Sequence, residues 1–168
     1  APPCHIHLGF LPLAANSGPG ILASLPPGFC LSAGNCYSQN RGGGVAVITR
    51  DLIPSSVIFS GSLDGAEVIA VKIDYGSSCI PVLGAYHPSQ STPHFNSLFL
   101  ELASSLCSSY NLVTVLGDFN YWAETDQDTS YAHIFKEGLS SLGITQLVIG
   151  TTHCKGHTMT KSGASPLS

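Results

Sequence analysis

Charged residues are scarce in this sequence. Only 10% of its 168 residues are Asp, Glu, Lys or Arg, and the formal net charge is −4. No stretch gathers Lys and Arg into a cluster, whereas proteins that bind nucleic acid mainly through charge present a basic face. The composition excludes that class, so any contact with nucleic acid has little electrostatic support. Hydrophobic residues make up 43% of the chain, which indicates a globular domain and excludes a disordered one.

Three further absences narrow the class of protein. No apolar run approaches the length that spans a membrane. The six cysteines have no repeated spacing, so they indicate free thiols in a reducing, intracellular compartment (nuclear or cytoplasmic) and not a disulfide scaffold. The opening "APPCHIHLGF" has neither an initiator Met nor a basic segment before an apolar one. We therefore expect the edge of a fragment and no signal peptide.

The length fits a single domain over residues 1–168. Residues 1–44 are rich in Pro and Gly and predict short extended pieces at most, and neither 1–25 nor 161–168 has a pattern that defines a structure. From Val45 onward, apolar β-branched runs alternate with turn residues, as in successive strands of a meander, one of them at "SSVIFS". The other expected strands are Val45–Thr49, Val68–Ile73, Val82–Tyr86, Leu112–Leu116 and Gln146–Ile149.

Two segments have the period of a helix instead. The apolar residues of "STPHFNSLFLELASSLCSSY" recur at helical spacing. Because Thr92 before Pro93 is a typical helix start, we expect a helix over Pro93–Ser108. A second helix is expected over Thr129–Leu142, with Gly143 as its C-terminal stop. Strands followed by helix, strand, helix and strand predict an α/β domain with a layered sheet.

The stretch "GDFN" places two polar side chains where an apolar strand, "NLVTVL", ends. Reactive groups collect at such ends, because the sheet fixes the backbone while the side chains face solvent. If Phe119 turns towards the core, alternation aims Asp118 and Asn120 to the same side. The carboxylate can orient a water or bind a divalent cation, and the amide can hold a phosphate oxygen. The alternative is an Asx-type turn, the commonest use of Asp and Asn near Gly.

Four segments occur in a recognisable order: "RGGGVAVITR", "LGAYHPS", "LGDFN" and "SLGITQLVIGTTHCKGHT". Together they resemble the endonuclease/exonuclease/phosphatase superfamily, and more narrowly the apurinic-type endonuclease domain of vertebrate LINE-type (non-LTR) retrotransposons, which are associated with a reverse transcriptase. The resemblance covers roughly Pro26 to Thr158. An ordered set of four segments is far more specific than one short motif.

The resemblance implies a DNase I-like fold, a two-sheet sandwich flanked by helices, and Mg²⁺-dependent cleavage of phosphodiesters in DNA. It implies that Asp118 activates the attacking water and is a metal ligand. Asn120 would hold the scissile phosphate, and Tyr86 would lean over it. We expect these three side chains to converge on one cleft, with His153 and His157 nearby as substrate-binding residues. In-line attack of water needs mainly positioning and charge stabilisation, which suits such residues.

The sequence departs from the family pattern in three places. The family has an upstream metal-binding glutamate in a "TETW"-like context, but no acidic residue precedes Asp51. Where the family continues "GHT" with an aspartate, as in "GHTLD", this chain has Thr160, and a C-terminal "SDH"-type pair is absent. We therefore expect a partial sandwich that lacks terminal strands, a weak or absent Mg²⁺ site, and weak or no activity. Open sheet edges would favour self-association. The alternative is a catalytically dead, domesticated binding module.

Other sites remain open from the sequence. "HCKGH" and "CHIH" together could be imagined as a zinc site, although their spacing fits no common zinc pattern. "RGGG" precedes a strand and lacks the later Lys-Ser/Thr of a P-loop, so it predicts a tight turn. The acidic residues Glu124, Asp126 and Asp128 could bind a cation, but a solvated loop explains them as well. An inositol-phosphate or lipid phosphatase of the same superfamily would carry its own substrate loops, and nothing here resembles them.

Overall fold

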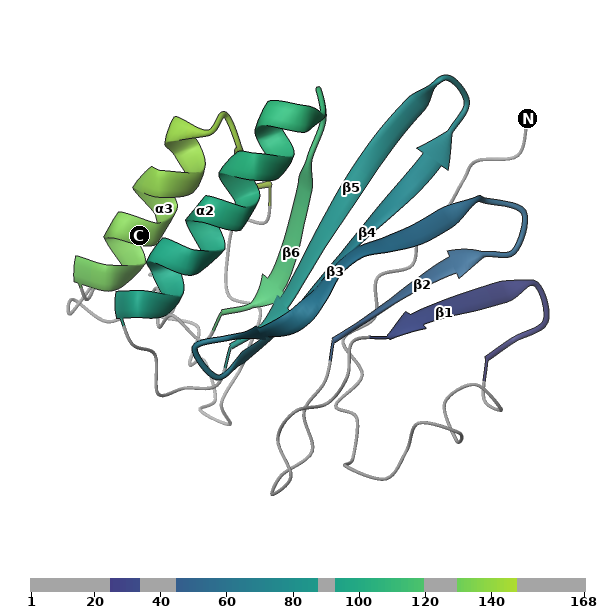
Figure 1. Ribbon diagram of the computed structural model, residues 1–168, viewed down its shortest axis with the longest axis horizontal. Helices are drawn as coiled ribbons and strands as arrows, with labels where there is room; N and C mark the ends of the chain where they lie inside the picture. The colour runs from purple at the N-terminus through teal and green to yellow at the C-terminus, as the bar shows by residue number, and fades with distance from the viewer. Residues whose placement is uncertain (1–24, 34–44, 88–92, 120–129, 148–168) are drawn as a thin grey trace, which may run out of the picture.

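A computed structural model describes residues 25–33, 45–87, 93–119 and 130–147 of the chain. Its strands are β1 (Phe29–Ala33), β2 (Ala46–Arg50), β3 (Ser55–Leu63), β4 (Ala66–Tyr75), β5 (Ser78–Tyr86) and β6 (Thr114–Asp118), and its helices are α2 (Pro93–Ser109) and α3 (Ser130–Ser141). β1 and β2 form a two-stranded antiparallel sheet. β3, β4, β5 and β6 form a four-stranded sheet in that spatial order (Figure 1).

The four-stranded sheet begins as a meander because its first connections are tight turns. The turn between β3 and β4 consists of Asp64 and Gly65, which have φ values of 49° and 81°. Two adjacent residues of positive φ are what a two-residue hairpin of the primed type requires, and Asp-Gly is a preferred pair for it. β5 follows β4 through a second hairpin, so that both pairs are antiparallel.

β6 joins the sheet differently, because it is parallel to β5. Neighbouring parallel strands need a crossover, and helix α2 lies in the connection between β5 and β6. This crossover brings the carboxyl ends of β5 and β6 to the same edge of the sheet.

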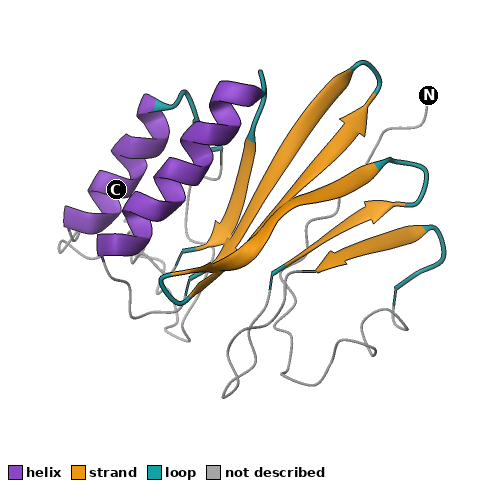
Figure 2. Cartoon of the chain, in the orientation of Figure 1, coloured by secondary structure: helices purple, strands orange, loops and turns teal. Residues whose placement is uncertain are grey.

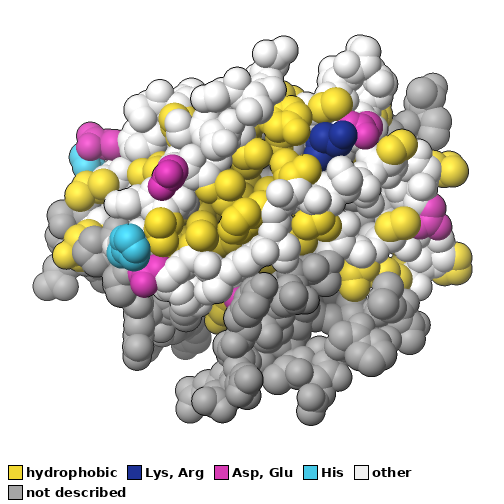
Figure 3. All heavy atoms as spheres, viewed as in Figure 1, with side chains coloured by type: hydrophobic (Ala, Val, Ile, Leu, Met, Phe, Trp, Pro, Cys, Tyr) yellow, Lys and Arg dark blue, Asp and Glu magenta, His cyan; other side chains and the backbone are white. Residues whose placement is uncertain are grey.

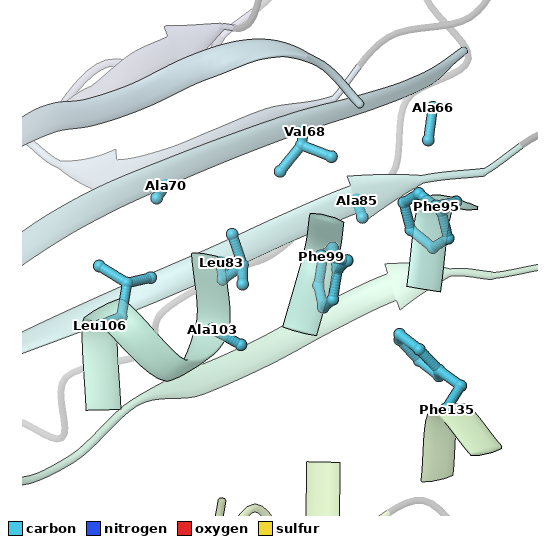
Figure 4. Close-up of a cluster of buried hydrophobic side chains, with 10 residues drawn as sticks. All are labelled: Ala66, Val68, Ala70, Leu83, Ala85, Phe95, Phe99, Ala103, Leu106 and Phe135. Atoms are coloured by element: carbon cyan, nitrogen blue, oxygen red, sulfur yellow. The ribbon is translucent and has the colours of Figure 1, made fainter. Parts of the chain in front are cut away.

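Both helices lie on one side of the four-stranded sheet (Figure 2). Phe95 and Phe99 of α2 are fully buried in a cluster that also contains Leu83 and Ala85 of β5 and Phe135 of α3 (Figure 4). The rings of Phe99 and Phe135 lie 5.5 Å apart in a tilted arrangement, a favourable geometry for aromatic pairs. This cluster is the core between the helices and the sheet.

The opposite face of the same sheet packs against residues at the start of β2. Val45 and Val47 form a second buried cluster with Ile69 and Val71 of β4 and Val82 of β5. β4 is therefore buried on both faces, as in a layered α/β domain. The predicted architecture, a partial two-sheet sandwich flanked by helices, is confirmed by these two clusters.

Both helices and the strand expected at Val45–Thr49 lie within one residue of α2, α3 and β2. β4 extends two residues beyond the predicted strand at each end, and β5 begins four residues before Val82. Two further strands differ more. The strand expected at Leu112–Leu116 begins at Thr114, where its pairing with Val82 begins, and Leu112 is 57% exposed. The strand expected at Gln146–Ile149 is wrong over its described part, since Gln146 and Leu147 belong to no strand. Leu147 is 88% exposed and has no packing against a sheet to hold it extended.

Among the described helices, neither has the length and apolar character needed to cross a membrane.

Candidate functional site at the ends of β5 and β6

Tyr86 and Asp118 are the last residues of β5 and β6, and they are register partners across the parallel pair. Partners in a register point to the same face of a sheet. Tyr86 is half-buried and packs against the cluster that contains Val45, whereas Asp118 is exposed. The structure thus brings two of the predicted site residues side by side at one strand edge. Their roles in chemistry stay predictions.

The sequence "GDF" has a packing reason for each residue. Phe119 points to the helical side, where its ring lies 4.9 Å from that of Phe135 and 5.5 Å from that of Phe99, as expected from the alternation. A Cβ at Gly117 would lie 2.6 Å from the Phe119 ring and 2.8 Å from the carbonyl oxygen of Ala85. Only glycine fits that approach without a shift of its neighbours. The close packing on one face leaves Asp118 on the other.

Glu67 extends the row to a third strand, because it is the register partner of Tyr86 on β4. Glu67 lies two and four residues before Ile69 and Val71 on the same strand, so its side chain is on the same face as the buried cluster that contains them. It is only 5% exposed. Glu67 was not predicted from the sequence, although a charged residue in phase with buried Ile and Val is an available signal. Adjacent strands lie roughly 4.8 Å apart, so Glu67 and Asp118 are separated by about 10 Å at their backbones.

His87 follows Tyr86 and joins the ends of β5 and β6. Its backbone N–H donates to the carbonyl oxygen of Asp118 at 2.9 Å, and its ring Nδ1 lies 3.3 Å from the carbonyl oxygen of Phe119. The ring stacks on Phe95 at a centroid distance of 4.1 Å. Burial lowers the pKa of His87, while the bond to Phe119 and the charge of Asp64 act in the opposite direction. His87 was not predicted from the sequence either, since "YHP" shows no sign of burial.

The described residues do not form a Mg²⁺ site. No group of three or more His, Cys, Asp or Glu side chains among them is arranged to hold a metal ion. Mg²⁺ keeps its waters unless several oxygen ligands share it, and the two carboxylates of the row differ, because Glu67 is buried and Asp118 is exposed. Asp118 alone does not fit the ion that the resemblance implies.

The other residues proposed from the sequence lie outside the described residues. These are Asn120, His153, His157, the acidic residues Glu124, Asp126 and Asp128, and the zinc candidates of "CHIH" and "HCKGH".

No family profile matches the sequence, and no curated protein is a match for it. Among solved structures, the chain is similar to that of D. rerio TDP2 complexed with single strand DNA product, at 10% identity and a TM-score of 0.45 over 79% of this chain and 50% of that one. It is also similar to an endonuclease/exonuclease/phosphatase family protein from Bacteroides thetaiotaomicron, at 15% identity and 0.49 over 70% and 48%. The human Nocturnin catalytic domain with bound sulfate anion matches at 11% and 0.49 over 76% and 52%.

The chain therefore spans about half the length of the solved chains that it matches. Values this low do not assign the chain to a family.

Proposed function

We propose that this chain is a retroelement-derived phosphodiesterase domain of the endonuclease type that acts on DNA with weak activity. The observation that carries the proposal is the register pair of Tyr86 and Asp118 at the ends of two parallel strands. These are two of the three residues that the resemblance assigns to the reaction, and they come from motifs 32 positions apart in numbering (118 − 86). The order of the four family-like segments supports the same assignment.

The proposed reaction is the in-line attack of a water on a DNA phosphodiester. The exposed carboxylate of Asp118 accepts the proton of the water as the new P–O bond forms. The bond to the leaving oxygen breaks, and that oxygen takes a proton from solvent. The Tyr86 hydroxyl donates to a non-bridging phosphate oxygen, and the Asn120 amide holds another. Such donors stabilise the charge that develops on the phosphate.

Weak activity is expected because Thr160 stands where the family has an aspartate after "GHT". The resemblance implies Mg²⁺, but no group of three or more His, Cys, Asp or Glu side chains among the described residues is arranged to hold a metal ion. Groups in such a site act as a unit, so losing one removes orders of magnitude in rate. The net charge of −4 also weakens non-specific attraction to DNA.

A nicking assay on supercoiled plasmid with Mg²⁺ or Mn²⁺ tests the proposal. We expect slow nicking by the chain, which is lost in Asp118→Ala and in Asn120→Ala. Asp51→Ala is the matched control, since Asp51 is an exposed carboxylate in a turn after β2, and it should nick like the parent chain. Fast nicking by the parent chain that both site variants abolish would support the endonuclease activity and contradict the proposal that this activity is weak.

The second candidate is a binding module that kept the fold and lost the chemistry, which Thr160 in place of the family aspartate favours. Nicking at background in all four proteins, together with DNA binding that Asp118→Ala leaves unchanged, would select it. Binding is measured by fluorescence anisotropy over a salt series, because contacts to phosphates weaken steeply with salt.

We also propose that the chain self-associates through a sheet edge. β3 is at one edge of the described four-stranded sheet, and its side chains Val57 and Ile58 are 47% and 40% exposed. Hydrophobic side chains gather across the middle of the face shown in Figure 3, where charged ones are sparse. An edge strand that carries exposed apolar side chains and no charge is a template for pairing with another chain.

A further inference from the structure

His87 is unusual among the histidines of the described residues because it is 1% exposed. A buried imidazole must have its polar atoms satisfied, whereas an apolar ring of similar size would fill the same space without that requirement. A position that needed only volume would therefore be served better by Phe or Leu. The hydrogen bonds of His87 show what the imidazole adds.

Both bonds end on consecutive peptide groups of the "GDFN" segment. The backbone N–H of His87 donates to the carbonyl oxygen of Asp118 at 2.9 Å, and Nδ1 lies 3.3 Å from the carbonyl oxygen of Phe119. A carbonyl oxygen can only accept, so Nδ1 must carry the proton. The first carbonyl belongs to the peptide between Asp118 and Phe119, and the second to the peptide between Phe119 and Asn120. His87 thus restrains the backbone on both sides of Phe119.

The ring that makes the second bond is itself fixed by the core. It stacks on Phe95 at 4.1 Å with an interplanar angle of 28°, and Phe95 is fully buried against Phe99 at 5.4 Å. The donor at Nδ1 is therefore held in place by helix α2, which contributes neither Tyr86 nor Asp118. Side chains that are locked by packing hold their neighbours more accurately than side chains on free loops.

We propose that His87 is a positioning residue of the candidate site, which fixes the end of β6 against the end of β5 so that Asp118 stays in place beside Tyr86. The inference rests on the proposed function, because it assigns His87 to that same site. It does not make His87 a catalytic residue, since the ring contacts backbone and core and not the reacting atoms.

Three variants separate the hydrogen bond from the packing. His87→Phe keeps a ring against Phe95 but removes the donor. His87→Asn keeps an amide N–H at the position of Nδ1 but removes the ring. His133→Phe makes the same substitution at a histidine of α3 that is 61% exposed, and serves as the control.

Two NMR measurements on the folded chain, without substrate, carry the test. Imidazole ¹⁵N shifts of the parent chain should show the neutral Nδ1–H tautomer at His87. The amide exchange rate at residue 87, taken relative to the intrinsic rate for its side chain, should then be divided by the rate at Val71, a buried residue of β4. His87→Phe removes the bond from Nδ1 to Phe119 and so loosens the end of β6, to which the amide of residue 87 donates. This loss should raise the ratio about tenfold. The ratio should stay within about threefold of the parent in His87→Asn and be unchanged in His133→Phe.

General destabilisation cannot imitate this result, because global opening accelerates exchange at Val71 at least as much as at residue 87 and so cannot raise the ratio. A proton on Nε2 in the parent chain, or an unchanged ratio in His87→Phe, overturns the proposal. If His87→Phe does not fold, the proposal is tested by the other two results. A proton on Nε2 in the parent chain, or a His87→Asn ratio more than about threefold from the parent, would contradict it. Failure of the parent chain to nick plasmid counts against the proposed function alone, since both NMR measurements are made without substrate.

Discussion

Gly117 is the position where the packing behind the candidate site can be tested most directly. In Gly117→Ala the new methyl group would lie 2.8 Å from the carbonyl oxygen of Ala85, and 2.6 and 2.7 Å from two ring atoms of Phe119. The ring could turn away, although it lies between Phe99 and Phe135. The carbonyl belongs to the neighbouring strand β5, so relieving that contact requires β6 to move away from β5.

The expected destabilisation follows from these contacts. Overpacking by one methyl group in a filled core costs about 1–3 kcal/mol, which is a large part of the roughly 5–15 kcal/mol by which domains are stable. For a chain of this length, each kcal/mol lowers the melting temperature by about 2–4 °C. For a destabilisation of about 2 kcal/mol, we therefore expect Gly117→Ala to melt roughly 4–8 °C below the parent chain.

Thermal melts followed by circular dichroism measure this shift, with Gly61→Ala as the matched control. Gly61 is a strand glycine of the same sheet, but a Cβ there would meet only the end of the Phe59 ring at 3.3 Å. That variant should stay within about 0.5 kcal/mol of the parent. If Gly117→Ala melts with the parent chain, β6 does not approach β5 as described, and the account of "GDF" is wrong.

Three further predictions concern stability and association. Burial lowers the pKa of His87 below its ordinary value of 6.5. As the pH falls, the imidazole therefore takes up a proton in the unfolded chain before it does so in the folded one. The stability that the neutral ring contributes is full above pH 6.5 and is lost as the pH falls through the folded pKa. Urea midpoints measured from neutral to acid pH should show this loss, and His87→Phe should remove it. Phe135→Ala should cost about 3–5 kcal/mol, because Phe135 is 3% exposed among three other Phe rings; Ile134→Ala, at a side chain 50% exposed, should be near neutral in the same urea titration. Val57→Lys should shift sedimentation velocity profiles towards the monomer, and an unchanged distribution would reject β3 as the associating edge.

The sequence alone determined the elements whose signals are local. The helical period and the Thr92–Pro93 start predicted α2 to within one residue, since a single face of apolar side chains suffices to define such a helix. Compact β-branched runs predicted β4 and β5 for a similar reason, and alternation correctly turned Phe119 towards the core. The proposal that Tyr86 and Asp118 belong together came from a family resemblance and not from any local pattern.

Only the tertiary structure decided which distant residues meet. That β6 runs parallel to β5, with Tyr86 opposite Asp118, depends on the crossover through α2. The same pairing starts β6 at Thr114, and makes Glu67 the third member of the row. His87 became visible in the same way, because its partners lie 31 and 32 residues further along the chain (118 − 87 and 119 − 87). Local periodicity contains no information about contacts over that separation, and packing between layers supplies it.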